Sequence, residues 1–534
     1  MNPIGGEALP TGFKGFLDNE DFIKAVAERI SKADTIDQSL GLLWYDLRPQ
    51  VQLLYPFKEL IPRISRLPRV TADGGNAYHW LRITEINLNN TSIGVSEGNR
   101  GAMLAINVQP QTANYKTIGL ESAVSFEARL GAKNLNPDAL GIAVQSTLRS
   151  VMIGEEQTLI LGNSTNGLGT TPTPTLSAAG SGGTWGAGTA YVMCVALTGL
   201  GWLGSSVANG VLGQVTKTNT DGSTDTFGGG SAQPSAEASV ATTSGQLVTA
   251  TVTPVAGAVA YAWYCSASTG TEALRAITTT NSVKLAGPGT GQAVTALKVS
   301  GSYVDNSKNA LLPDGIIPQI YGQIFGAAPG TSMATNQNLP AVANTGDTIA
   351  LAAGSGSIVY TKAAGNTGLS IQGNTSVGEW DCILQAAYDQ YKLGFDRILM
   401  SSQDISAMSG FLGTANNPLR ILFDAEAETG RIVAGRRVTS YLNKWFGNTL
   451  DIEVHPFVPP GTQIFWSDRV PYELSGVPNI LEAHVRMDYY QIQWPFRSRR
   501  YEYGCYADEV FACYFTPAFA ILANNYPAAG TPTV

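Results

Sequence analysis

Few residues of this sequence are of the types that carry acid–base, nucleophilic or metal chemistry. Histidine, whose side chain titrates nearest to neutral pH, occurs only as His79, His455 and His484. Each lies in or beside a segment patterned like a strand, so we expect three hydrogen-bonded structural histidines. The sequence contains no H-E-x-x-H, G-x-S-x-G, Walker A or C-x-x-C motif. We therefore predict that the protein is not an enzyme and that it has no catalytic residue, cofactor or metal site.

Carboxylates occur in two close groups that could do acid–base work or bind divalent cations. Glu155 and Glu156 are adjacent near the end of a helical pattern, and Asp424, Glu426 and Glu428 alternate in the segment LFDAEAETGR. Adjacent or alternating carboxylates on a helix or loop are usually exposed to water. The prediction for both groups is a solvated surface.

Arginine is concentrated in two segments that also contain apolar or aromatic residues, RISRLPR (63–69) and WPFRSRRYEY (494–503). Arginine interleaved with aromatic side chains can bind nucleic acid. However, the chain has a net charge of −8, whereas proteins that grip DNA through its phosphates are usually basic. We therefore favour an edge strand or a subunit contact, in which the arginines pair with acidic neighbours. The arginines concerned are Arg63, Arg66, Arg69, Arg497, Arg499 and Arg500.

The first part of the chain is predicted to hold an extended arm, a hairpin and one long helix. Residues 77–88 and 102–112 alternate in polarity like strands, and a turn-rich segment separates them. Pro137 can occupy the first position of a helix, an apolar face then recurs at helical spacing, and Gly162 can end it. The predicted helix over 137–161 would be roughly 35–40 Å long, which suits a structural beam.

The segment 176–312 differs in composition from the rest of the chain. It has ten charged residues among 137, whereas the other 397 residues contain 64. Alternating runs at 246–255 and 259–268 and a run rich in threonine and β-branched residues at 273–285 are separated by turn signals, which favours a small β-sandwich. We interpret this segment as an inserted all-β domain.

After residue 313 the pattern mixes helices and strands. Ser376 and Glu379 have the spacing of a capping box ahead of an amphipathic helix. Residues 395–401 are predicted to form a strand and residues around 402–412 a second helix, and the end of the chain is rich in strands. The fold class predicted for the whole chain is therefore α+β.

Composition argues against several classes of protein. Charged residues make up only 14% of the chain but hydrophobic residues 44%, which is unlike a disordered protein. Five cysteines without a C-x-x-C pair favour reduced thiols, and the first residues lack the layout of a signal peptide. The 60 residues from Gln157 to Thr216 carry no charge, but glycine and polar residues interrupt them too often for a membrane helix. We expect their most apolar stretch, 190–204, to form a buried strand and a turn.

The order of the predicted elements resembles that of one family. The elements are an extended arm, a long hairpin, the strand TANYKTIGLESAVSFEARLG (112–131), a long helix ending in EEQTLILGNSTNGLGTTPTP (155–174), the segment NALLPDGIIPQIYGQI (309–324), an amphipathic helix and a strand-rich close with DIEVHPFVPPGTQIFWSD (451–468). This order resembles the major capsid proteins of tailed double-stranded DNA bacteriophages, which have the Hong Kong-type capsid fold. The resemblance covers roughly residues 20–175 and 309–525, so it leaves out the inserted segment.

The resemblance implies a role for each part of the chain. The implied parts are an N-terminal arm (1–70), an E-loop (71–117), a peripheral domain with a spine helix (118–175), an inserted immunoglobulin-like β-sandwich that projects outward (176–312), a mainly axial domain (313–480) and a return to the peripheral domain (481–534). The arginines that become candidate assembly contacts are Arg63, Arg66, Arg69, Arg82, Arg100, Arg497, Arg499 and Arg500.

The function implied by the resemblance is that of a structural capsid subunit. Many copies would assemble as hexamers and pentamers into the icosahedral shell of a virion, in the cytoplasm of a bacterial host. The shell would enclose double-stranded DNA without reading its sequence, would meet portal, scaffolding and optional cement proteins, and would need no membrane. Some members join an E-loop lysine to an asparagine of a neighbour. Residues 71–115 contain no lysine, so we expect no such covalent link.

Three other classes stay open from the sequence. An encapsulin-like nanocompartment would share the fold and package protein instead of DNA. A secreted β-rich adhesin or glycan-binding protein would use the aromatic residues of the insertion, Trp202, Tyr261, Trp263 and Tyr264. A cytosolic enzyme with unrecognised residues is disfavoured by the scarcity of histidine.

Overall fold

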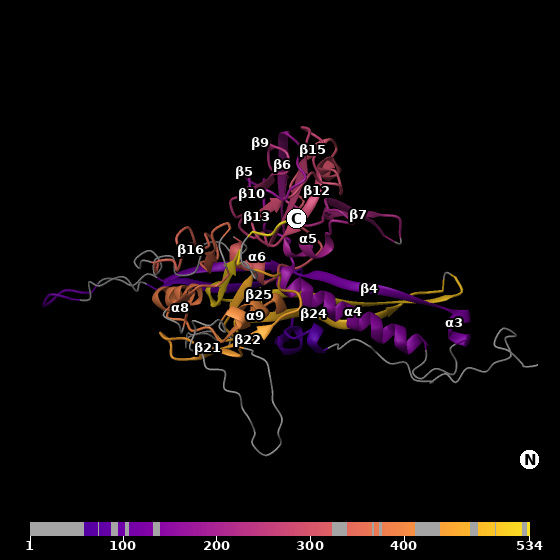
Figure 1. Ribbon diagram of the computed structural model, residues 1–534. Helices are drawn as coiled ribbons and strands as arrows, with labels where there is room; N and C mark the ends of the chain where they lie inside the picture. Colours follow the sequence, from indigo (N-terminus) through magenta and orange to yellow (C-terminus); the bar gives the residue numbers. More distant parts are fainter. Residues whose placement is uncertain are drawn as a thin grey trace, which may run out of the picture.

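The chain forms an elongated body with an all-β module standing on one side of it (Figure 1). Helices and long sheets occur together in the body, so the predicted α+β class is confirmed. The computed structural model describes residues 58–72, 74–86, 94–101, 106–131, 139–219, 221–322, 339–365, 368–372, 376–411, 438–469, 479–496, 498–525 and 531–534.

One half of the body is a four-stranded sheet with a long helix lying along it (Figure 1). The sheet has the order β1-β24-β25-β4, and β1 pairs with β24 in the parallel direction while the other pairs are antiparallel. Ile118, Val151 and Cys505 join the helix to the sheet in a small apolar cluster. The elements are β1 (Arg69–Thr71), β4 (Lys116–Ser125), α3 (Phe126–Gly131), α4 (Ala139–Leu161), β24 (Leu481–Gln493) and β25 (Arg500–Cys513).

Helix α4 confirms the long helix that the sequence predicts over 137–161. Its 23 residues span about 34 Å at 1.5 Å per residue. Its first half is mostly half-buried and its second half is mostly buried. Asn136 and Pro137, from which its start was predicted, lie outside the described residues.

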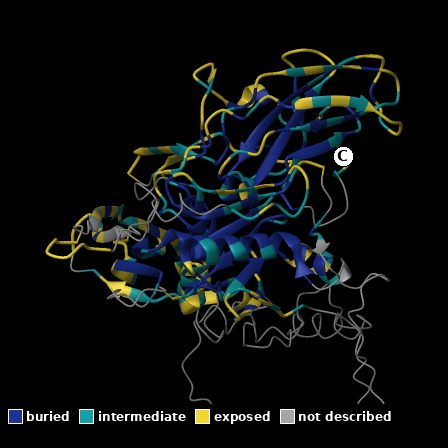
Figure 2. Cartoon of the chain, turned by 90° about the vertical axis from the view of Figure 1, so that its left-hand side faces the viewer, coloured by how far each residue is buried: buried dark blue, intermediate teal, exposed yellow. Residues whose placement is uncertain are grey.

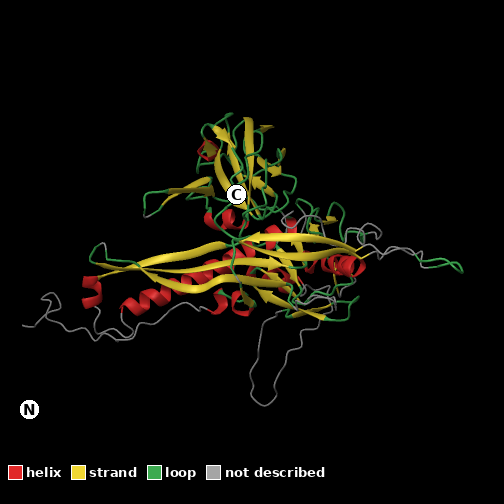
Figure 3. Ribbon diagram, turned by 180° about the vertical axis from the view of Figure 1, so that it is seen from behind, coloured by secondary structure: helices red, strands yellow, loops and turns green. Residues whose placement is uncertain are grey.

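The predicted hairpin is present as β2 (Ala77–Ile86) and β3 (Ile106–Asn114). The two strands pair in the antiparallel direction from Ala77 opposite Asn114 to Ile86 opposite Ile106. The hairpin runs toward the end of the body opposite α3, and residues 94–101 of its connection lie on the far left of Figure 1. Seen from behind, the same hairpin and the long sheet form one extended bar (Figure 3).

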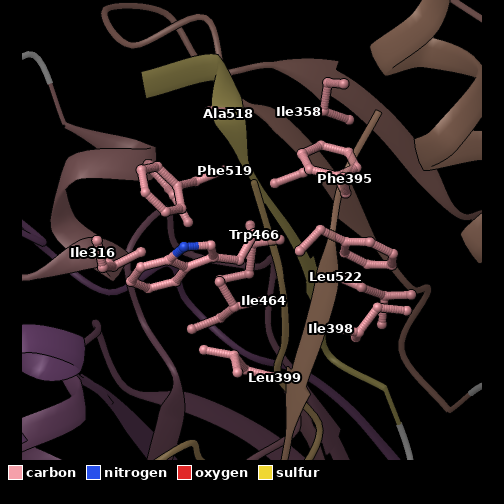
Figure 4. Close-up of a cluster of buried hydrophobic side chains, with 14 of the residues drawn as sticks. Ile316, Ile358, Phe395, Ile398, Leu399, Ile464, Trp466, Ala518, Phe519 and Leu522 are labelled. Atoms are coloured by element: carbon pink, nitrogen blue, oxygen red, sulfur yellow. The ribbon is translucent and has the colours of Figure 1, made fainter. Parts of the chain in front are cut away.

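The other half of the body is a mixed seven-stranded sheet of order β16-β17-β26-β23-β20-β22-β21. Its core packs against helices and contains Trp380, Phe395 and Phe465, part of which is drawn in Figure 4. The strand predicted at 395–401 and the helix predicted around 402–412 are confirmed as β20 and α9. The elements are α6 (Ile316–Tyr321), β16 (Thr348–Leu351), β17 (Ile358–Thr361), β18 (Ile371–Gln372), β19 (Ser376–Val377), α8 (Gly378–Tyr391), β20 (Arg397–Met400), α9 (Ser402–Phe411), β21 (Ser440–Leu442), β22 (Thr449–Val454), β23 (Gln463–Trp466), η5 (Thr516–Ala518) and β26 (Phe519–Ala523).

The predicted capping box at Ser376 and Glu379 is wrong. Val377 is the N-cap of α8 and makes no side-chain cap, because Ser376 already belongs to the short strand β19. The Glu379 carboxylate is buried and turned inward, 2.5 Å from the Lys362 ammonium. It also accepts the Ser370 N–H. The buried ion pair with Lys362 therefore positions Glu379, and the predicted cap does not form.

The module is a sandwich of two sheets, of orders β13-β10-β5 and β12-β11-β6-β9. Trp263 and Val248 lie in the apolar core between the sheets. A second cluster that includes Tyr264 and Val294 covers the other face of the larger sheet. Both faces of that sheet are therefore buried, as the dark strands inside the module show (Figure 2). The strands are β5 (Thr175–Ala179), β6 (Gly188–Leu197), β9 (Ala238–Thr242), β10 (Leu247–Thr251), β11 (Ala260–Ser266), β12 (Ala273–Thr278) and β13 (Ser282–Leu285).

Two local predictions for the module need correction. The run 273–285 forms two strands, β12 and β13, because the chain turns between them. The apolar stretch 190–204 ends in a short helix rather than a turn, since the Thr198 hydroxyl accepts the Gly201 N–H and caps it. In the described part of the chain, no helix is both long and apolar enough to cross a membrane. The remaining elements are α5 (Gly199–Gly204), β7 (Gln214–Thr218), β8 (Thr224–Gly228), η4 (Val294–Leu297), β14 (Lys298–Val299) and β15 (Ser302–Tyr303).

The strands of residues 481–534 are shared among three sheets. β24 and β25 belong to the four-stranded sheet and β26 to the seven-stranded sheet. Residues near Thr533 pair with β13 of the module. The division of the chain into arm, E-loop, peripheral and axial parts stays a prediction.

Candidate assembly surfaces

Residues 58–69 lie against the middle of the body, where Glu156 of α4 holds them. Two short turns, η2 (Lys58–Leu60) and η3 (Ile64–Arg66), lead into β1. The Glu156 carboxylate is fully buried. It accepts the Arg63 N–H at 3.0 and 3.2 Å and the Ile64 N–H at 2.6 Å. It thereby satisfies backbone donors at the start of η3 that would otherwise be unpaired.

His455 completes the surroundings of Glu156. Its Nδ1 accepts the Phe457 N–H at 3.2 Å, and its Nε2 lies 2.7 Å from Glu156 Oε1. Because Nδ1 is an acceptor, the proton of a neutral imidazole lies on Nε2 and is donated to Glu156. We call Glu156, His455 and the Arg63 and Ile64 backbone, together with the side-chain contacts of Arg63 and Arg69 described below, the buried junction.

The side chains of Arg63 and Arg66 both meet Glu453 within the same chain. Arg63 is buried, 3.0 Å from Glu453, and its guanidinium lies 4.8 Å above the Trp466 ring. Burial lowers the pKa of Arg63 to about 10, although Glu453 opposes this effect. Arg66 is 63% exposed and lies 3.3 Å from Glu453. Arg63 is therefore occupied inside the chain, whereas Arg66 still reaches solvent.

Arg69 holds the other side of the buried junction. Its guanidinium pairs with Glu155 at 2.5 Å, with Asp488 at 2.8 Å and with Glu509 at 3.3 Å. Burial acts to lower the pKa of Arg69, but the carboxylates, Glu155 first among them, raise it. The Tyr489 hydroxyl also donates to Glu155. Three elements distant in sequence, β1, α4 and the β24–β25 pair, are therefore joined by one arginine.

Glu509 is a fully buried carboxyl that faces Glu155. Burial and the nearby Glu155 charge raise the pKa of Glu509 well above its ordinary value. Two carboxyls this close share a proton more readily than they both ionise. We infer that Glu509 retains its proton, since Arg69 lies closer to Glu155 than to Glu509.

The solvated surface predicted for Glu155 and Glu156 is wrong. Both side chains are fully buried, because residues 63–69 cover one side of α4 and the four-stranded sheet covers the other. Asp424, Glu426 and Glu428 lie outside the described residues. Within the described ranges, no three or more His, Cys, Asp or Glu side chains are grouped so as to hold a metal ion.

All three histidines make the hydrogen bonds expected of structural residues. His79 Nδ1 lies 2.8 Å from the Thr112 hydroxyl across the hairpin. His484 stacks on Tyr78 with ring centres 3.7 Å apart and lies 2.8 Å from the Tyr514 hydroxyl. Burial lowers the pKa of His484, although Glu482 opposes the shift. The Tyr78–His484 stack thus fixes the base of the hairpin to the sheet.

Farther along, the hairpin presents apolar side chains to water. Leu81 is 74% exposed and Val108 is also exposed, whereas Trp80 is buried against the body. Arg82 lies on β2 opposite Gln109, and Arg100 is exposed in the connection between the strands. We call Leu81 and Val108 the hairpin surface.

A second apolar surface lies at the other end of the long sheet, beside α3 (Figure 1). Phe496 is 66% exposed and Phe126 is 42% exposed, and both rings contact Tyr501. These residues line a hollow of about 340 Å³ with Arg499 and Arg500. We call Phe126, Phe496, Arg499, Arg500 and Tyr501 the tip patch.

Charges of both signs surround the tip patch. Arg499 pairs with Glu127 at 2.8 Å, and both side chains are largely exposed. The Arg129 guanidinium lies 4.9 Å from the centre of the Tyr501 ring. Arg497 lies outside the described residues. Sequence reasoning found the arginines here but missed Phe126, although Phe496 beside three arginines was a signal for an exposed aromatic contact.

The aromatic residues considered for glycan binding are mostly core residues of the module. Tyr261, Trp263 and Tyr264 are buried, and Trp202 packs against both the body and the module. A glycan-binding platform needs exposed rings, so this basis for the adhesin alternative fails.

Comparison of the whole chain with solved structures finds a capsid, a phage chain and an encapsulin among its matches. Its structure is similar to the capsid of a native GTA particle, with 9% identity, a TM-score of 0.42 and coverage of 92% of this chain and 100% of that one. It is similar to a chain of Mycobacterium phage Bobi, with 9% identity, a TM-score of 0.37 and coverage of 92% and 98%. It is also similar to the SrpI encapsulin of Synechococcus elongatus PCC 7942, with 9% identity, a TM-score of 0.36 and coverage of 92% and 96%. No protein-family model and no curated protein matches the sequence.

Proposed function

We propose that this chain is the major capsid subunit of a tailed double-stranded DNA bacteriophage. In this proposal many copies form hexamers and pentamers and close into an icosahedral shell around the genome. The observation that carries the proposal is the pair of exposed apolar surfaces, the hairpin surface and the tip patch, at opposite ends of one long body. The order of elements, which resembles that family, points the same way.

The hairpin surface needs a partner for physical reasons. A two-stranded hairpin is marginal in water on its own, and an exposed leucine on it gains roughly 1.5–3 kcal/mol when it is buried. Leu81 has no cover within the described part of the chain. A neighbouring copy would supply the missing cover.

The tip patch has the composition of a protein interface. Interfaces are enriched in aromatic residues and arginine, and here Phe126, Phe496 and Tyr501 stand beside Arg499 and Arg500. Because the two surfaces lie at opposite ends of the body, contacts between them are heterologous and can close into rings. Among the predicted arginine contacts, Arg66, Arg100, Arg499 and Arg500 are the better candidates, since Arg63 and Arg69 are engaged within the chain.

In this proposal the shell encloses DNA, and the subunit does not bind a specific DNA sequence. The net charge of −8 and the internal pairing of Arg63 and Arg69 leave little basis for a phosphate-binding strip. Portal, scaffolding and optional cement proteins, assembly in the host cytoplasm and a non-enzymatic role follow from the same proposal. The module would project from the outer surface as an immunoglobulin-like decoration.

Purified particles test this function. Rate-zonal sedimentation and negative-stain microscopy of the expressed chain should show large closed particles, and particles from the natural source should protect DNA from nuclease. Particles filled with protein and free of DNA would favour the nanocompartment. A stable monomer under all assembly conditions would overturn both shell proposals.

A further inference from the structure

The last four residues of the sequence, 531–534, lie against the module and not on the body (Figure 1). They run parallel to β13, with Thr533 opposite Lys284. The Lys284 N–H donates to the Pro532 carbonyl at 2.7 Å, and the Val534 N–H donates to the Lys284 carbonyl at 2.9 Å. The Ala286 N–H donates to the Val534 carbonyl at 2.7 Å. These residues therefore add a strand to the edge of a sheet, which is a known mode of peptide recognition.

The chain just before this segment is fixed to the body. The Asn525 N–H donates to the Gly461 carbonyl at 2.9 Å, and its side-chain amide donates to Asp404 at 3.2 Å. Gly461 has a φ of +85°, and a Cβ at this position would lie 2.5 Å from the Asn525 carbonyl oxygen. A glycine is therefore needed where the chain passes.

Asn524 joins the body directly to the module. Its side-chain oxygen accepts the Asn281 N–H at 2.8 Å, and its side-chain nitrogen donates to Asn281 Oδ1 at 2.6 Å. The same nitrogen donates to the Lys362 carbonyl at 2.8 Å. Asn524 has a φ of +61°, a conformation that asparagine tolerates better than most residues. Both asparagines are buried, so these bonds are shielded from water.

We propose that the edge of β13 is a strand-binding groove taken by residues 531–534 of the same chain, and that this strap holds the module at a fixed angle to the body. Only five residues separate Asn525, which is fixed to the body, from Thr531. Five residues span at most about 20 Å when fully extended. The module therefore cannot tilt far without pulling the strap from β13.

The strap also protects an edge. β13 pairs with β10 on one side only. Without the strap, the N–H and C=O of Lys284 and the N–H of Ala286 would be open to pairing with another chain, whereas the Ala286 carbonyl accepts the Thr184 N–H within the module. Strand alternation places the N–H groups of Val283 and Leu285 toward β10 instead. β13 and Ala286, the residue that follows it, therefore contain both the test amides and their internal controls.

Hydrogen exchange on the unassembled subunit tests the first part of the proposal. Deleting residues 531–534 should speed exchange of the Lys284 and Ala286 amides at least tenfold and leave the Val283 and Leu285 amides unchanged. Val534→Pro removes one donor and should give an intermediate effect at Lys284. Thr533→Pro is the matched control, because the Thr533 N–H makes none of the three bonds. Equal exchange at Lys284 and Ala286 with and without the strap would overturn the proposal.

The fixed angle is tested by a distance distribution between two spin labels. Ala187→Cys in the module and Ser440→Cys in the body are exposed positions, whereas the five native cysteines are buried. Deleting 531–534 should broaden the distribution, and Thr533→Pro should leave it unchanged. An unchanged width after the deletion would refute the fixed angle. Both experiments use the subunit alone, so their outcome does not depend on whether shells form.

Discussion

The buried junction and the tip patch are two regions with similar sequences and opposite surroundings. Both place arginine beside aromatic residues, Arg63 over Trp466 in one and Arg129 over Tyr501 in the other. In the buried junction, carboxylates from distant parts of the chain meet the arginines and exclude water. At the tip patch, Arg499 pairs with Glu127, and both side chains are largely exposed.

The difference shows that acidic partners decide what an arginine-rich segment does. Where Glu155 and Glu453 satisfy the cations, the segment becomes part of the fold. Where the aromatic rings and cations remain uncovered, the segment is available to another molecule. The following predictions test this contrast, from the largest expected effect to the smallest.

Removing Glu156 should have the largest effect on folding. Glu156→Ala leaves the Arg63 and Ile64 N–H groups and His455 Nε2 buried without their acceptor. Breaking a buried charged contact of this kind costs about 3–5 kcal/mol, measured as the loss of unfolding free energy in urea. Glu127→Ala at the tip patch is the control and should change stability by less than about 0.5 kcal/mol. A loss below about 1 kcal/mol for Glu156→Ala would contradict the structural role of the buried junction.

Phe496→Ser should separate assembly from folding. Phe496 is 66% exposed, so its loss should leave the unfolding midpoint of the free subunit nearly unchanged. If a neighbour covers the ring, each contact loses roughly 1.5–3 kcal/mol, and the critical concentration for assembly measured by light scattering should rise at least tenfold. Trp494→Ser, beside the patch and also exposed, measures the effect of losing an aromatic ring outside it. If the Phe496→Ser subunit has the same critical concentration for assembly as the unmodified chain, the tip patch is not part of the interface.

Stability should fall as the pH rises because of Glu509. Burial and Glu155 raise the pKa of Glu509 in the folded chain, so the folded state retains a proton that the unfolded state has released. The stabilising proton is fully present below the ordinary glutamate pKa and is lost as the pH rises through the raised value. The slope is at most about 1.4 kcal/mol per pH unit. Arg69 and Asp488 also face this site, and their charges set the size of the effect. Tyr489 faces it as a neutral hydroxyl, because burial raises the pKa of Tyr489.

Urea unfolding at a series of pH values measures this slope. Glu509→Gln keeps a donor toward Glu155 and carries no titratable proton, so its stability should depend less on pH above the ordinary glutamate pKa. Glu127→Gln, at an exposed position, should keep the slope of the unmodified chain. Identical slopes for Glu509→Gln and the unmodified chain would show that Glu509 is ionised in the fold.

The last prediction concerns covalent links between subunits at the hairpin, where we expect none. Residues 71–115 contain no lysine, and Lys116 donates to the Ala310 carbonyl of its own chain. Boiled particles should therefore run as a single band on a denaturing gel. A ladder of covalent oligomers would show that the hairpin is cross-linked to a neighbour.

Local patterns predicted the elements, but not the contacts that bury charge. The periodicity of α4, the alternation of β2 and β3 and the composition of the module were each visible along the chain. The surroundings of Glu155 and Glu156 depend on β1 pairing with β24, for example Arg69 opposite Ala483, and no local pattern records that pairing. The capping signal at Glu379 failed for the same reason, because Lys362 lies nearby only in the folded chain. Exposure at Phe496 could be suspected from its arginine neighbours, but Phe126 is brought to it by the pairing of β4 with β25.

Hydrogen exchange compared between the free subunit and assembled particles tests the central claim most directly. The account predicts strong new protection of the β2–β3 hairpin and of the residues around Phe126 and Phe496 in particles. It predicts little change at the Arg63 and Ile64 amides, which Glu156 already holds in the free chain. Particles in which the hairpin and the tip patch exchange as fast as in the free subunit would contradict the claim that these two surfaces build the shell.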